Sequence, residues 1–96
     1  MKEIMLDIPN TFSGLAGNKY GRKIYDEQVA GKIDDFKDVV IVFPDNITDI
    51  ATSFLQGFFK IPVDSIGVEG IMKNFTYKSH IPELENVVRT ALVTMR

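Results

Sequence analysis

The chain has 96 residues, a formal net charge of −2 and no cysteine. At this length a single domain over residues 1–96 is expected, and the composition, 45% hydrophobic and 25% charged, is that of a globular protein. The absence of cysteine excludes disulfides and thiolate chemistry, and the lack of any basic run argues against nucleic acid as a partner. No stretch approaches the roughly 18 consecutive apolar residues of a membrane span. We therefore expect a cytoplasmic protein without a membrane partner.

The first predicted elements are a strand over residues 2–8 and a helix over residues 19–33. Apolar and polar residues alternate in the strand, which is the period of a sheet with one covered face. In the helix, apolar residues recur every four positions. The loop between them, residues 9–18, is rich in glycine, and Asn18 is the expected N-cap of the helix.

The second strand is predicted over residues 38–43, DVVIVF. This run of β-branched and aromatic residues does not alternate, which is typical of a central strand covered on both faces. Pro44 ends it, and a helix over residues 50–60 follows with three phenylalanines on one apolar stripe. A glycine inside a helix is costly, so Gly57 predicts the close approach of another backbone.

The last third of the chain holds one segment without a clear pattern. Residues 61–73 mix turn residues with isolated apolar ones, which leaves a short helix and a loop both open. Residues 74–79, NFTYKS, have strand composition. Ser79 followed by Pro82 and Glu83 is typical of a helix start, and a strongly periodic last helix follows.

The order β-α-β-α-β-α predicts an α/β fold with a small, mainly parallel or mixed sheet that carries helices. Sheets of this kind meet ligands and partners at the carboxyl ends of their strands. Here that edge consists of the loops 9–18 and 44–51, so these two loops are the first place to look for a site.

The stretch VVIVFPDNITDIATSFLQGFF resembles the central motif of the STAS superfamily (sulfate transporter and anti-sigma factor antagonist domains), a hydrophobic strand, a turn, then Asp-Ser-Ser-Gly opening a helix. With YGRKIYDEQV upstream and KSHIPELENVV near the end, the chain is more similar to the small prokaryotic STAS-like domains of unknown function. The resemblance covers about residue 10 to the end. It implies a STAS-like fold and a non-enzymatic regulatory module without a cofactor, whose protein partner is a histidine-kinase-like ATPase or an anti-sigma factor.

The resemblance also implies a phosphorylation site at the start of the second helix. In the antagonists of this superfamily, a partner kinase phosphorylates the second serine of the motif, and the phosphate controls the partnership. Ser53 holds that position here and Thr52 holds that of the first serine, whereas Ala51 replaces the aspartate and Phe54 the glycine. The implied regulatory site therefore matches the superfamily motif at Ser53, keeps a hydroxyl at Thr52, and departs from it at Ala51 and Phe54.

A partner surface is accordingly predicted over residues 44–57, with Asn46 and Asp49 beside the two hydroxyls. A second interpretation of Thr52 and Ser53 stays open at this point. Hydroxyl side chains are favoured at helix starts because they accept hydrogen bonds from unpaired backbone N–H groups, which contributes about 1 kcal/mol.

The glycine-rich loop 14–22 supports a different function, a small-ligand or nucleotide sensor. Glycines free main-chain N–H groups for an anion at a helix N-terminus, and two cations lie nearby. The spacing fits neither a P-loop nor GxGxxG, so an ordinary loop is the competing interpretation. The candidate anion-binding residues are Gly17, Asn18, Lys19, Gly21 and Arg22.

No catalytic group can be assembled from the sequence, so an enzyme is not predicted. His80 is the only histidine, and no serine, cysteine or carboxylate stands at a spacing that suggests a triad. Asp45, Asp49 and Asp64 lack a further fixed ligand, so they are expected to serve as turn or solvent-facing residues and not as a metal site.

Overall fold

The computed structural model describes residues 2–96, and three parallel strands form its main sheet. β1 (Lys2–Met5), β3 (Val39–Val42) and β5 (Phe75–Lys78) lie in the order β1-β3-β5, so β3 is the central strand. Both neighbouring pairs run parallel. The predicted α/β architecture with a small parallel sheet is confirmed, and so is the strand predicted near residues 74–79.

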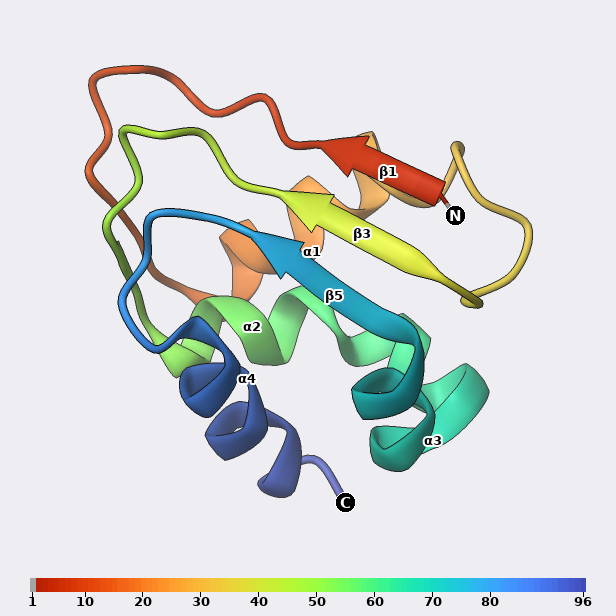
Figure 1. The fold of residues 1–96 in the computed structure, drawn as a ribbon. Coiled ribbons are helices and arrows are strands. Elements are labelled where there is room, and N and C mark those ends of the chain that lie inside the picture. The colour runs from red at the N-terminus through yellow and green to blue at the C-terminus, as the bar shows by residue number, and fades with distance from the viewer. Residues whose placement is uncertain (1) are drawn as a thin grey trace.

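The four helices of the described chain all lie on one side of this sheet (Figure 1). They are α1 (Asn18–Gln28), α2 (Thr52–Phe58), α3 (Lys60–Asn74) and α4 (Leu84–Val93). Both crossovers step in the same direction across the sheet, and right-handed crossovers of this kind place their helices on the same face. α2 lies in the middle of the layer, where it contacts the other three helices. Within the described residues, no helix has the length and apolar character to cross a membrane.

The opposite face of the sheet carries no helix within the described chain, although the strand predicted over residues 38–43 is central and has buried residues on both faces. Val39 and Ile41 point into the apolar core between sheet and helices. Val40 lies outside that core and is nevertheless buried. A central strand is flanked on both sides, so its apolar residues are shielded by neighbouring strands even where no helix covers them.

α1 and α2 cross so closely that only glycine fits at the contact. A Cβ on Gly21 would overlap with the main-chain carbonyl of Phe54, and a Cβ on Gly57 would overlap with that of Asn18. The close backbone approach predicted at Gly57 is confirmed, and Gly21 is its counterpart on α1. Phenylalanines fill the core around this crossing, and those of the predicted apolar stripe are among them: Phe54 and Phe58 of α2, Phe59 between α2 and α3, and Phe75 of β5 are all buried.

The first helix is shorter than predicted over residues 19–33 and begins differently. It ends at Gln28, because Gly31 lowers the helix propensity of the following turn. Gly17, not Asn18, is the N-cap, and no side chain caps the helix. Asn18 is therefore the first helical residue and not the cap that the sequence predicted.

The second helix, predicted over residues 50–60, runs only from Thr52 to Phe58, and α3 begins two residues later. α3 accounts for the segment 61–73, for which a helix and a loop were both open. It breaks at Gly67, where φ is 77°. The break interrupts the helical period, which explains why the sequence shows no single apolar stripe.

The last helix begins at Leu84, later than the predicted start at Ser79, Pro82 and Glu83. The Ser79 hydroxyl accepts a hydrogen bond from the main-chain N–H of Ile81 at 3.2 Å. The hydroxyl therefore stabilises a local turn and does not cap the helix. The N-cap position is held by Glu83, with φ of 52° and no side-chain cap.

Replacing either crossing glycine by alanine is expected to destabilise the protein. Gly57→Ala and Gly21→Ala place a methyl group against a backbone carbonyl that cannot move without separating α1 from α2. We expect a loss of about 1–3 kcal/mol in the free energy of unfolding, measured by urea denaturation. Gly31→Ala is the matched control, because nothing lies near its added Cβ. If all three variants unfold alike, close packing at the crossing is not important for stability.

Candidate functional site

The carboxyl ends of β1 and β3 continue into two loops that lie side by side (Figure 1). They contain two short strands that the sequence did not indicate, β2 (Gly14–Leu15) and β4 (Asp49–Ile50), which pair in parallel. The loops 9–18 and 44–51, predicted separately as the functional edge of the sheet, are thus brought together. This carboxyl edge is the candidate functional site.

Side-chain and main-chain hydrogen bonds both join the two loops. The Asn46 amide nitrogen donates to the carbonyl oxygens of Pro9 and Phe12, at 3.3 and 2.7 Å. The main-chain N–H groups of Thr48 and Ala51 donate to carbonyls of the first loop at 2.9 and 2.8 Å. Asn46, predicted as a partner-binding residue, therefore has a structural role in holding the first loop.

Ser53 joins the start of α2 to the start of α1. Its half-buried hydroxyl oxygen accepts a hydrogen bond from the main-chain N–H of Gly17 at 3.0 Å. The N-cap of α2 is Ala51, and no side chain caps this helix. The interpretation of Thr52 and Ser53 as caps of their own helix is therefore wrong, because both lie at the first helical positions and not before them.

An aromatic series leads from the surface of this edge into the core. Phe12 is 40% exposed, and its ring centroid lies 6.1 Å from that of Tyr20. Tyr20 in turn lies 5.8 Å from the buried ring of Phe54. Burial raises the pKa of Tyr20, and the charge of Glu27 raises it further, so the phenol stays neutral at physiological pH. Sequence reasoning missed Phe12 because a single aromatic residue in a loop shows no pattern.

The predicted anion-binding residues lie at or near the start of α1, but several of their groups have other protein partners. The Gly17 N–H donates to Ser53, and Gly21 is buried against α2. The Arg22 guanidinium contacts the Asp26 carboxylate at 3.1 Å. Asn18 and Lys19 are exposed. Anion binding at Gly17, Asn18, Lys19, Gly21 and Arg22 stays a prediction.

The three aspartates considered for metal binding do not gather. Asp49 is exposed on β4, Asp45 contacts the imidazole of His80 at 3.1 Å, and Asp64 forms an ion pair with Lys60 at 2.9 Å on α3. Within residues 2–96, no group of three or more histidine, aspartate or glutamate side chains could hold a metal ion.

Comparison of the chain with protein-family models, with curated proteins and with solved structures gives no significant match. The likeness to STAS-like domains therefore rests on the sequence motif and stays a prediction. The geometry of the carboxyl edge has to carry any functional argument by its own contacts.

Removing the Asn46 side chain is expected to loosen the joined loops. Asn46→Ala removes the donor to the Phe12 carbonyl and one of the two donors to the Pro9 carbonyl, and we expect a loss of about 0.5–1.5 kcal/mol in the free energy of unfolding. The amides of Thr48 and Ala51 should exchange with deuterium faster in this variant. Asn10→Ala, at an exposed position of the loop 9–18, is the control and should change neither quantity. Unchanged exchange in Asn46→Ala would contradict the role given to this side chain.

Proposed function

We propose that this protein is a non-enzymatic, cytoplasmic regulatory module that binds a protein partner through its carboxyl edge, with Ser53 as the site of control. One observation carries the proposal, the hydrogen bond from the Gly17 N–H to the Ser53 hydroxyl. It makes a modifiable hydroxyl part of the joint between the two loops that form this edge. A change at Ser53 is thereby transmitted to the surface that the partner contacts.

The exposed aromatic residue supports the choice of a protein as the partner. Aromatic side chains that stay exposed on a rigid base are the commonest anchors of protein interfaces. Phe12 has such a base, because its ring lies against that of Tyr20 and the Asn46 amide donates to its main-chain carbonyl. Asp45 and Asp49, exposed polar residues of the loop 44–51, are suited to the rim of an interface.

Phosphorylation of Ser53 would act on the joint itself. A phosphate adds about −1.5 to −2 charge and three acceptor oxygens at a position that is now half-buried. The added group cannot occupy the space of the present hydroxyl, so the starts of α1 and α2 have to separate or the side chain has to turn outward. Either response displaces the loop that carries Phe12. The resemblance to anti-sigma factor antagonists makes a histidine-kinase-like ATPase or an anti-sigma factor the first partner to test.

Charge at Ser53 is expected to abolish partner binding, whereas loss of the hydroxyl alone is expected to weaken it less. The protein is purified from its native cells as wild type, Ser53→Ala and Ser53→Glu, and co-purifying proteins are quantified. Ser65→Glu, an exposed serine on α3, is the matched control. Phosphopeptide mass spectrometry of the wild type shows whether Ser53 or Thr52 carries phosphate.

The proposal predicts a partner that is retained by wild type and Ser65→Glu and lost from Ser53→Glu. A partner retained equally by all four proteins would exclude control at Ser53. Loss of that partner from Phe12→Ala separates the two parts of the proposal, because this variant removes the surface anchor and leaves the hydroxyl unchanged. A partner that tolerates Phe12→Ala binds elsewhere.

A further inference from the structure

The two edges of the main sheet are formed by β1 and β5. Just beyond the end of β1, the side-chain amide of Gln28 bonds both main-chain groups of Asp7, accepting from its N–H at 2.7 Å and donating to its C=O at 2.8 Å. At the other edge, β5 pairs with β3 alone. Within residues 2–96, no side chain bonds the main chain of Tyr77, which lies in the middle of this edge strand.

One hydrogen bond shows which groups of β5 are free. The Phe43 N–H donates to the Lys78 carbonyl at 2.9 Å, so the main-chain groups of Lys78 face β3. Main-chain groups alternate in direction along a strand, and those of Thr76 therefore also face β3. The N–H and C=O of Tyr77 point away from the sheet, where they can pair with an added strand.

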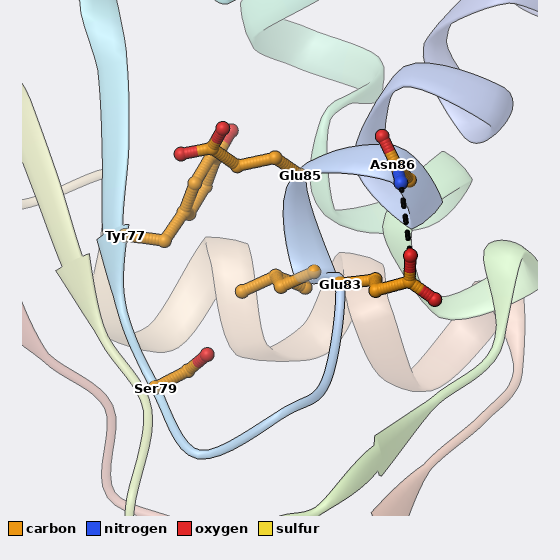
Figure 2. Close-up of a pocket in the computed structure, with 6 residues that line it drawn as sticks. Tyr77, Ser79, Glu83, Glu85 and Asn86 are labelled. Atoms are coloured by element: carbon orange, nitrogen blue, oxygen red, sulfur yellow. Dashed lines mark hydrogen bonds between the residues drawn. The ribbon is translucent and has the colours of Figure 1, made fainter.

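Two cavities lie in a row beside this free edge, between β5 and α4. Their volumes are about 330 Å³ and 150 Å³, and Tyr77 and Glu85 line both. Figure 2 shows the larger one, with Tyr77 and Ser79 on the β5 side and the start of α4 opposite. The smaller one has apolar walls from Met72, Phe75 and Val88.

Glu85 gives the groove a negative charge. Its side chain extends from α4 toward Tyr77 (Figure 2), and within the described residues it forms no ion pair. Burial raises the pKa of Tyr77, and the charge of Glu85 raises it further, so the tyrosine stays a neutral phenol. The carboxylate of the neighbouring Glu83 accepts a hydrogen bond from Asn86 at 3.4 Å. Glu83 keeps its charge in this hydrogen bond, and the guanidinium of Arg89 lines the smaller cavity, so the groove carries two carboxylates and one cation. Glu85 is the carboxylate that lines both cavities.

We propose that the groove between β5 and α4 binds an extended peptide segment of a partner protein that adds a strand to the β5 edge. The peptide places a lysine or arginine beside Glu85 and, two residues along, an apolar side chain against Met72 and Phe75. Side chains two residues apart on a strand point the same way and lie about 6.6–6.8 Å from each other, which suits two adjacent cavities. Main-chain bonds to Tyr77 supply affinity and the two cavities supply specificity.

A second copy of this chain fits the groove less well than a basic peptide. If β5 of a second copy paired with this edge, its helix-facing side chains would be Phe75 and Tyr77, which are packed in their own core. Its Lys78 would lie on the other face of the sheet, because side chains alternate along a strand. β5 of a second copy therefore brings no cation to Glu85.

Titration of the ¹⁵N-labelled full chain with short capped peptides tests the proposal by NMR. The probe is Thr-Lys-Thr-Val-Thr, and the controls replace its lysine by glutamate or its valine by threonine. We expect shift changes confined to residues 75–79 and 83–89, slower exchange of the Tyr77 amide, and a Kd of about 1 mM or tighter. Each control peptide should bind more weakly than the probe.

Reversing the charge of Glu85 should reverse the order of affinity for two of these peptides, the lysine probe and the control that carries glutamate in its place. Glu85 is exposed, so Glu85→Lys is expected to fold normally. The variant should bind the lysine peptide about fivefold to tenfold more weakly than wild type and the glutamate peptide more tightly. Glu27→Lys makes the same charge change on α1 and should leave both affinities unchanged.

Several results would overturn the proposal. They are equal binding of the lysine and glutamate peptides to wild type, shift changes outside the groove, and no binding of the probe. A wild-type protein that sediments as a dimer with its Tyr77 amide already protected would assign the edge to a second copy. None of these results bears on Ser53, because the peptide experiment uses the isolated protein and tests a different surface.

Discussion

The contact between Gly21 and Gly57 determines how the rest of the helix layer is placed. Each glycine packs against the backbone of the other helix, so α1 and α2 approach more closely than side chains would allow. α2 also contacts α3 and α4, and it therefore transmits the position of this crossing to the whole layer. A small domain gains most of its stability from burying apolar surface, and the close crossing permits the phenylalanines of α2 to lie against both α1 and the sheet.

The same crossing brings the starts of α1 and α2 together, and the carboxyl edge depends on it. The Gly17–Ser53 hydrogen bond lies at the starts of these helices, beside the paired strands β2 and β4. The side chains of Asn46 and Ser53, which are predicted from the sequence to bind a partner, form hydrogen bonds within this edge instead. This joining is the feature that supports the proposed regulatory role, because a change in one hydroxyl would affect a continuous surface and not an isolated loop.

Periodicity and composition in the sequence were sufficient to predict the three strands of the main sheet, three of the helices and the close approach at Gly57, because apolar patterns and a helical glycine report local requirements. The predictions failed where contacts between residues far apart in the sequence, or a break within a helix, determine the local structure. Gly67 divides α3, so no single period covers it, and Ser79 and Ser53 both have hydroxyls that bond away from the helix starts they seemed to mark. The Ser53 hydroxyl bonds the N–H of Gly17, which lies before α1 and far from Ser53 in the sequence. No pattern in a single sequence indicates such a hydrogen bond.

The topology also accounts for the groove at β5. Crossovers that step in one direction place every helix on one face and leave two free edges, one at β1 and one at β5. Free edges invite uncontrolled pairing, and proteins usually cover or blunt them. In this chain the Gln28 amide bonds the main chain of Asp7, just beyond β1, and within residues 2–96 no side chain bonds the main chain of Tyr77 on β5. The shaped and charged groove beside Tyr77 is the feature that supports a ligand strand at the β5 edge.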